Sequence, residues 1–291
     1  MYGDMIKHIN VVLTIILLLV PFSNVFSVSS HMIETNEDMS EDINLWAVII
    51  TVGNTDLDDR NSEDLNNLLL DNGWDKDNIY KLRENEATKK AILSISYLLN
   101  ENGLKNEDIV LFYFSMHGGR FDDVNPIDEP DGLDEFIIPF RENENEDKIL
   151  DDELNLMFEK INSENIVIIF ETCYSGGMID GTKDLKKSGR IIMTSTKEDE
   201  TSYGFFLKES WVFPYYLMKA LRGKADKNFD SFISAEEAFE FAKVKTIRRT
   251  TIYGYLLFVF HKSLFIQHPQ IYDGWPSEEN NTDELILVSI N

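Results

Sequence analysis

The stretch "NIVIIFETCYSGG" (residues 165–177) is the most informative part of this sequence. Its apolar run has no polar interruption, which is typical of a strand covered on both faces of a parallel sheet. The run leads through Glu171 into Cys173, the only cysteine among 291 residues, and then into a Gly-Gly turn. A lone thiol at the end of a buried strand is a candidate nucleophile.

Further apolar runs of the same kind alternate with helical patterns along the chain. We expect strands at residues 45–53, 78–83, 108–115, 164–171 and 189–195, and helices at 62–73, 86–103, 150–161 and after Pro214. This alternation predicts one α/β domain over residues 45–291 with a mostly parallel sheet. Residues 251–266 fit either a strand or a buried helix.

The N-terminus reads as a targeting segment. Lys7 and His8 precede the apolar run of residues 11–20, and small residues follow, so residues 1–27 are predicted to be a secretory signal peptide. Residues 28–44 read as a polar linker. The prediction is therefore a secreted protein without a stable membrane span after signal cleavage. The alternative is a membrane-anchored protein that keeps an uncleaved N-terminal segment.

The composition limits the partners of the chain. Its 52 acidic and 27 basic side chains produce a formal net charge of −25. Nucleic-acid binding is excluded, because contacts to phosphates need clustered Lys and Arg.

Two of the predicted parallel strands run directly into reactive residues. The strand at 108–115 leads into His117 and Gly118, and the strand at 164–171 leads into Cys173. Ligands bind at the carboxyl ends of strands in open α/β sheets, so these side chains are expected to meet there if the strands are neighbours. A free cysteine is more often a small buried hydrophobe, and a lone histidine is more often structural. The residues by themselves leave both interpretations open.

The motifs around these residues resemble those of the caspase-like cysteine peptidases of clan CD. The segment Glu171–Gly176 is similar to the E-A-C-x-S-G signature of the legumain family, and Met193–Gly204 is similar to that family's next strand and loop. Asp128–Phe140, followed by "ILDDEL", looks instead like metacaspases. Met116 departs from the family form S-G-H-G, whereas His117 and Gly118 agree with it.

The resemblance implies a three-layer α/β/α fold and a cysteine endopeptidase that acts on proteins or peptides. His117 and Cys173 would form the catalytic dyad, which passes through a thioester acyl-enzyme. Backbone N–H groups of Gly118 and Cys173 would form the oxyanion hole. No cofactor is required for this chemistry. One alternative is a transamidase or peptide ligase with the same dyad, and another is an inactive calcium-binding module of the same fold.

The pocket for the substrate residue before the cleaved bond, P1, is expected beside Cys173. Glu171 lies on the same face of the strand as Cys173, because side chains alternate along a strand. Arg60 stands where the legumain family has a pocket arginine, and Ser195 is the expected third wall. Opposite charges in one pocket favour Asn over Arg or Lys at P1. Alternatively, Glu171 is merely a charge at the strand end.

A calcium loop is a further hypothesis. The segment "DKNFDSFISAEE" (residues 226–237) has the ligand spacing of an EF-hand, with Ser231 where the sharp turn normally has Gly. The predicted ligands are Asp226, Asn228, Asp230, Phe232, Ser234 and Glu237. The same residues also fit a helix capping box formed by Ser234 and Glu237.

Overall fold

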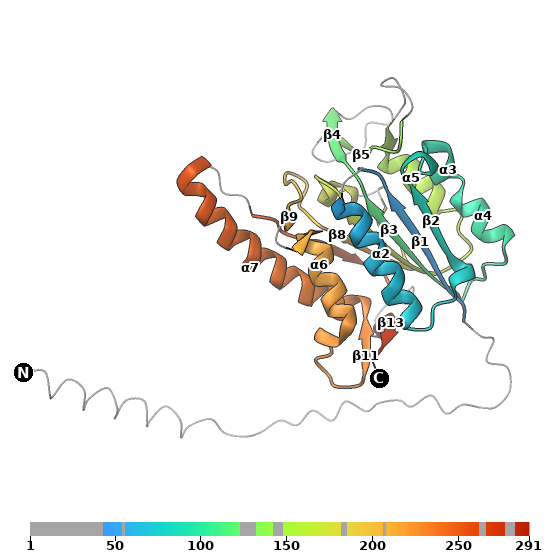
Figure 1. Ribbon diagram of the computed structural model, residues 1–291. Helices are drawn as coiled ribbons and strands as arrows, with labels where there is room; N and C mark the ends of the chain where they lie inside the picture. The colour runs from blue at the N-terminus through green and yellow to red at the C-terminus, as the bar shows by residue number, and fades with distance from the viewer. Residues whose placement is uncertain are drawn as a thin grey trace, which may run out of the picture. The chain divides into compact units, whose positions relative to one another are not determined.

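A six-stranded sheet lies at the centre of the computed structural model, and five of its strands are parallel (Figure 1). The strand order is β12 (Gln270–Asp273), β8 (Arg190–Thr194), β7 (Asn165–Glu171), β3 (Ile109–Ser115), β1 (Leu45–Thr51) and β2 (Ile79–Arg83). Only β12, at one edge, is antiparallel to its neighbour. The predicted mostly parallel sheet is confirmed.

The part of the chain that the structure describes begins at the end of the predicted linker. It comprises residues 43–53, 56–122, 132–141, 148–181, 185–205, 208–261, 266–276 and 283–290. The predicted signal peptide, residues 1–27, and the linker up to residue 42 lie outside the described residues. Asp42–Asn291 form one compact unit.

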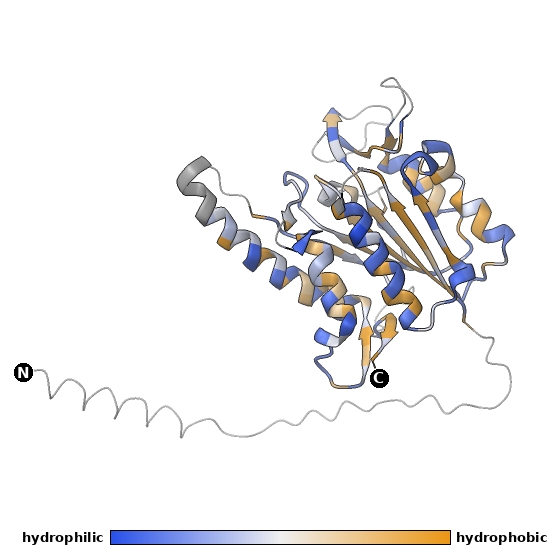
Figure 2. Ribbon diagram, in the orientation of Figure 1, coloured by the Kyte–Doolittle hydropathy of each residue, from blue (hydrophilic) through white to orange (hydrophobic). Residues whose placement is uncertain are grey.

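Helices cover both faces of the sheet, which is the three-layer arrangement that the sequence predicts (Figure 1). One face packs against α2 (Asp56–Asp71), α6 (Val212–Lys219) and α7 (Ala235–His261), and the other against α3 (Lys89–Leu93), α4 (Ile95–Glu101) and α5 (Asp151–Phe158). Successive residues of each central strand belong to opposite cores, as Ile49 and Ile50 do. The strands are therefore apolar throughout, and Figure 2 shows them hydrophobic between amphipathic helices.

Three small sheets, absent from the sequence prediction, complete the fold. They consist of β4 (Gly118–Asp122), β5 (Leu133–Ile137) and β6 (Ile149–Leu150); β9 (Gly204–Phe205) and β10 (Ser210–Trp211); and β11 (Phe232–Ser234) and β13 (Ile286–Ser289). Their strands are short and half-polar, so they carry little periodic signal. The first sheet starts directly after His117.

Three helix predictions need correction or completion. The helix expected over residues 86–103 is two helices, because the Ser94 hydroxyl donates to the Lys90 carbonyl at 2.7 Å and the chain turns there. Helix α6 starts before Pro214, whose missing N–H is not needed in a first turn. The ambiguous segment from residue 251 is helical to His261. No helix among the described residues is long and apolar enough to cross a membrane.

Candidate active site

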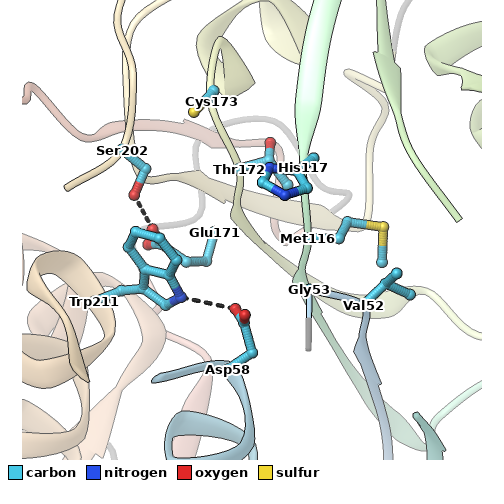
Figure 3. A pocket seen from close by; sticks show the side chains of 10 residues that line it. All are labelled: Val52, Gly53, Asp58, Met116, His117, Glu171, Thr172, Cys173, Ser202 and Trp211. Atoms are coloured by element: carbon cyan, nitrogen blue, oxygen red, sulfur yellow. Dashed lines mark hydrogen bonds between the residues drawn. The ribbon is translucent and has the colours of Figure 1, made fainter. Parts of the chain in front are cut away.

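His117 and Cys173 emerge at the same edge of the sheet. Strands β3 and β7 are parallel neighbours in a register that pairs Ser115 with Glu171, the last residue of each strand. Two residues further along lie His117 and Cys173, and Figure 3 shows both side chains at the mouth of one pocket. The structure therefore brings together the two side chains that the sequence predicts to meet.

The turn that carries Cys173 is held by hydrogen bonds from the neighbouring chain segment. The Thr172 carbonyl accepts from the Ser195 hydroxyl at 3.2 Å and from the Thr196 hydroxyl at 3.3 Å. Tyr174 has a left-handed backbone, with φ of 61°, and its N–H donates to the Glu200 carbonyl at 2.8 Å. Cys173 is therefore presented on a fixed turn rather than on a loose loop.

The thiol of Cys173 is half-buried, and its surroundings disfavour the thiolate. Burial raises the pKa of Cys173, a backbone hydrogen bond from Ser202 lowers it in part, and the neighbouring Glu171 raises it further. No hydrogen bond joins Cys173 to His117 in this unliganded arrangement. Catalytic hydrogen bonds often form only around substrate. A nucleophilic thiolate at this position needs His117 to accept the proton.

Gly118 allows the backbone after His117 to approach the backbone of the cysteine turn. A Cβ atom at Gly118 would lie 2.6 Å from the Cys173 carbonyl oxygen, closer than real contacts allow. The Ile138 N–H donates to the His117 carbonyl at 2.9 Å, so the next pair, Gly118 and Ile137, is a non-hydrogen-bonded pair. The Gly118 N–H consequently points away from β5, where a substrate oxygen can reach it.

A cavity of about 70 Å³ with an acidic floor lies below the dyad. Its lining residues are Val52, Gly53, Asp58, Met116, His117, Glu171, Thr172, Cys173, Ser202 and Trp211 (Figure 3). Glu171 and Asp58 are 3% and 4% exposed, so both carboxylates are out of bulk water. Burial raises the pKa of Glu171 to about 8, the Ser202 hydrogen bond counters part of this shift, and the charge of Asp58 adds to it.

Asp58 is a pocket residue that the sequence interpretation missed. Its Oδ1 atom accepts from the Ser115 hydroxyl at 2.8 Å and from the Trp211 indole N–H at 2.7 Å. Asp58 belongs to the acidic first turn of α2, which follows β1 at the carboxyl edge of the sheet. An acidic helix start directly after a predicted parallel strand is the signal that could have indicated it.

Arg60, predicted to line the pocket, does not line it. Its side chain is 54% exposed and forms an ion pair with Glu209. Asp58 and Arg60 are two positions apart on α2, so roughly 200° of helical rotation separates them and only one can face the pocket. The expected mixed-charge pocket is therefore corrected to a pocket with two carboxylates.

The third wall of the pocket also differs from the expectation. Ser195 is fully buried behind Glu171 and does not line the cavity, because its hydroxyl donates to the Thr172 carbonyl. Ser202, from the loop before β9, lines the cavity and donates to Glu171 Oε1. Loop residues without a periodic pattern leave no sequence signal for such a contact.

The predicted calcium loop lies in a different part of the fold and is mostly exposed. Asp226 accepts backbone hydrogen bonds from Phe229 at 2.7 Å and Ser231 at 3.3 Å. Ser231 has a φ of 70°, the left-handed conformation that Gly adopts most easily. Ser234 accepts from the Glu237 N–H at 3.0 Å, as the capping-box interpretation expects. Among described residues no His, Cys, Asp or Glu cluster is arranged to hold a metal. Calcium binding stays a prediction.

Comparisons with known proteins point to one family for the central part of the chain. Residues 58–182 match the family model described as metacaspase, peptidase C14 domain. Metacaspase-1 of Candida albicans is 32% identical over 131 residues, and metacaspase-1 of Lodderomyces elongisporus is 30% identical over the same length. Each match covers 40% of this chain and 29% of the relative, so the chain matches less than a third of these relatives' length.

A solved structure supports the same fold over more of the chain. The Geobacter sulfurreducens protein GSU0716 superposes with a TM-score of 0.57 at 16% identity, covering 85% of this chain and 100% of that one. At this identity the likeness concerns the fold alone. The matched family segment contains the cavity residues from Asp58 through Cys173. The closeness to the legumain family stays a prediction.

Proposed function

We propose that this chain is a caspase-like cysteine endopeptidase with Cys173 as nucleophile and His117 as general base, and the match of residues 58–182 to the metacaspase family model supports this. The observation that carries the proposal is the parallel pairing of β3 and β7. This pairing places the two side chains at one pocket mouth.

The proposed reaction proceeds through a thioester. His117 accepts the proton of Cys173 as the sulfur attacks the substrate carbonyl, and the amine leaves with a proton from His117. Water, deprotonated by His117, then hydrolyses the thioester. The backbone N–H groups of Gly118 and Cys173 stabilise the negative oxygen of each tetrahedral intermediate.

The pocket below the dyad favours a cationic P1 side chain. The sequence-based preference for Asn depended on Arg60 entering the pocket, and Arg60 pairs with Glu209 instead. Asp58 and Glu171 are two buried acceptors of negative character, and a Lys or Arg side chain supplies the donors and the opposite charge that such acceptors need. We therefore propose cleavage after Arg or Lys, with Asn as the competing outcome.

Substitution of the dyad tests the proposal most directly. Cys173→Ala and His117→Ala should each lower kcat by roughly a thousandfold or more, and the double variant should lose little beyond either single one. The measurement uses fluorogenic peptides that differ only at P1, with an active-site-directed thiol probe as a second readout. Circular dichroism confirms that the variants are folded. Retained cleavage by Cys173→Ala would remove the thiol from the mechanism, and cleavage after Asn alone would remove the cationic pocket.

We further propose that the chain is exported, on the strength of its first 27 residues alone. Expression with a C-terminal tag, followed by separation of medium, membranes and cell contents, tests this. A tagged product of unreduced mass in the membrane fraction would favour the uncleaved anchor instead.

A further inference from the structure

A row of polar side chains crosses the sheet under the proposed P1 pocket. Thr51, Ser115 and Glu171 are in register on the adjacent strands β1, β3 and β7, and Ser195 follows the end of β8 beside them. All four are at most 3% exposed and lie on the face that α2 covers. Tyr113 lies one step deeper on the same face of β3. The strand ends beneath the pocket are therefore polar, whereas the middle of this face of the sheet is mostly apolar.

Some buried oxygen atoms of this floor receive no hydrogen bond from the described residues. Ser202 donates to Glu171 Oε1, whereas Oε2 has no hydrogen-bond partner within the described part of the chain. The same holds for the Thr51 hydroxyl oxygen. Asp58 Oδ1, by contrast, accepts from both Ser115 and Trp211. Buried polar atoms without partners are rare in folded proteins, and here Glu171 Oε2 belongs to a residue that lines the cavity.

The ionisable groups that face Glu171 are acidic, with no positive charge beside them among the described residues to compensate. Asp58 faces it from α2, Tyr113 from β3, and Cys173 from the turn after β7. Ser195, Ser202 and Trp211 are neutral, and the Ser195 hydroxyl beside Glu171 donates to the Thr172 carbonyl. Among described lining residues only His117, at the cavity mouth, can carry a positive charge. Two buried carboxylates without a cation between them do not both ionise readily. Asp58 has two donors to stabilise its charge, so the extra proton belongs on Glu171.

We propose that Glu171 holds a proton on Oε2 in the empty pocket and releases it when a cationic P1 side chain binds. This inference rests on the proposed peptidase function and specifies how its pocket selects substrate. The O–H bond of the carboxylic acid breaks, the proton passes to solvent, and the resulting carboxylate accepts N–H groups of the bound side chain. With the proton retained, the pocket presents one charge and one donor, which suits a neutral amide or urea.

The electrostatics of the site agree with this assignment. Burial raises the pKa of Glu171 to about 8, with Asp58 adding to the shift, so the acid form dominates at neutral pH in the empty pocket. A bound guanidinium lowers that pKa again, because an opposite charge favours the carboxylate. Preference for cationic over neutral P1 residues must therefore increase with pH.

Two peptides that differ only at P1, with arginine or its neutral isostere citrulline, test the proposal. The ratio of their kcat/KM values cancels the titration of Cys173 and His117, which affects both peptides alike. We expect the arginine-to-citrulline ratio to rise between about pH 6 and about pH 9, by up to about tenfold per pH unit, as Glu171 ionises. A ratio that is flat over this range in the wild type would overturn the proposal.

Two variants separate a role of Glu171 from a general effect of charge. Glu171→Gln should abolish the pH dependence of the ratio, whereas Glu209→Gln, at an exposed glutamate outside the pocket, should keep it. A pH-dependent ratio that survives in Glu171→Gln would assign the proton to another group and overturn the proposal.

Proton release on binding supplies a readout that needs no turnover. Calorimetry of the Cys173→Ala protein with the arginine peptide, in two buffers of different ionisation enthalpy, should show release of up to one proton near pH 7, and none with citrulline. Binding without proton release would overturn the inference and leave the peptidase function intact. Absence of cleavage and of thiol labelling would instead remove the proposed function, and the calorimetric result would still decide whether Glu171 holds the proton.

Discussion

The chain contains two groups of acidic residues with opposite physical settings: the pocket floor of Asp58 and Glu171, and the loop of residues 226–237. The floor carboxylates are buried, and Glu171 Oε2 has no donor among the residues that the structure describes. In the loop, Asp226 and Asp230 accept hydrogen bonds from backbone N–H groups only a few residues away, and Asp230 is exposed. Carboxylates whose needs are met by their own loop and by water gain less from a ligand than buried ones do.

This difference shows what ligand spacing in a sequence can and cannot indicate. The loop has the clearer motif, and its Asp226 and Asp230 accept hydrogen bonds from their own backbone. The floor has no motif that joins its two residues, because they are far apart in the sequence and meet only across the sheet. Burial, rather than spacing, is what leaves a carboxylate in need of a partner.

Between the two acidic groups, the largest effect on cleavage is expected from neutralising the floor. Asp58→Asn should lower kcat/KM for a P1 arginine peptide by on the order of 100-fold, because truncating one partner of a buried charge pair costs 2 kcal/mol or more. Asp59→Asn is the matched control, since Asp59 is the next residue of α2 but is exposed and pairs with Arg83. Peptide kinetics at fixed pH measure both. Equal losses of kcat/KM in the two variants would contradict a specific role of the buried Asp58 in binding the P1 arginine.

A further effect is expected on stability. The folded-state pKa of Glu171, about 8, exceeds its ordinary value of 4.5, so between these pH values the folded chain binds a proton that the unfolded chain has lost. Stability contributed by this group is therefore greatest below about pH 4.5 and falls until about pH 8, by on the order of 5 kcal/mol.

Glu171→Gln removes this titration. Its free energy of unfolding relative to wild type should increase with pH across that window, as measured by urea denaturation at several pH values. The exposed loop supplies the control, because Asp230→Asn makes the same kind of acid-to-amide change at a solvent-exposed position. Parallel pH profiles for Glu171→Gln and wild type would contradict the assignment of the buried proton.

The smallest expected effect concerns calcium at the loop. If calcium binds there, it should stabilise the folded chain by about 3 kcal/mol at a concentration 100 times its dissociation constant, and Glu237→Ala should remove the corresponding rise in Tm. Glu240→Ala, on the exposed side of α7, is the matched control. A melting temperature that calcium does not change would leave the capping contact of Ser234 as the only role of the motif.

Much of the catalytic edge could be predicted from sequence because its signals are local. An apolar run between turn residues indicates a buried strand, and the residue type at its end follows directly from the chain. The central strands were predicted within one or two residues in this way, and so was the meeting of His117 with Cys173. These two side chains meet because β3 and β7 are parallel neighbours that end at the same level of the sheet.

The rest depended on contacts between distant segments. Whether Asp58 or Arg60 faces the pocket is decided by how α2 rotates against the sheet, and Trp211 helps to hold that rotation through its hydrogen bond to Asp58. The burial of Glu171, and with it the raised pKa, depends on the loop that carries Ser202. The sequence alone thus determined the strands and the reactive residues at their ends, because local periodicity encodes them. Only the tertiary structure decided the charge of the pocket, because desolvation and helix orientation arise when segments far apart in the chain pack together.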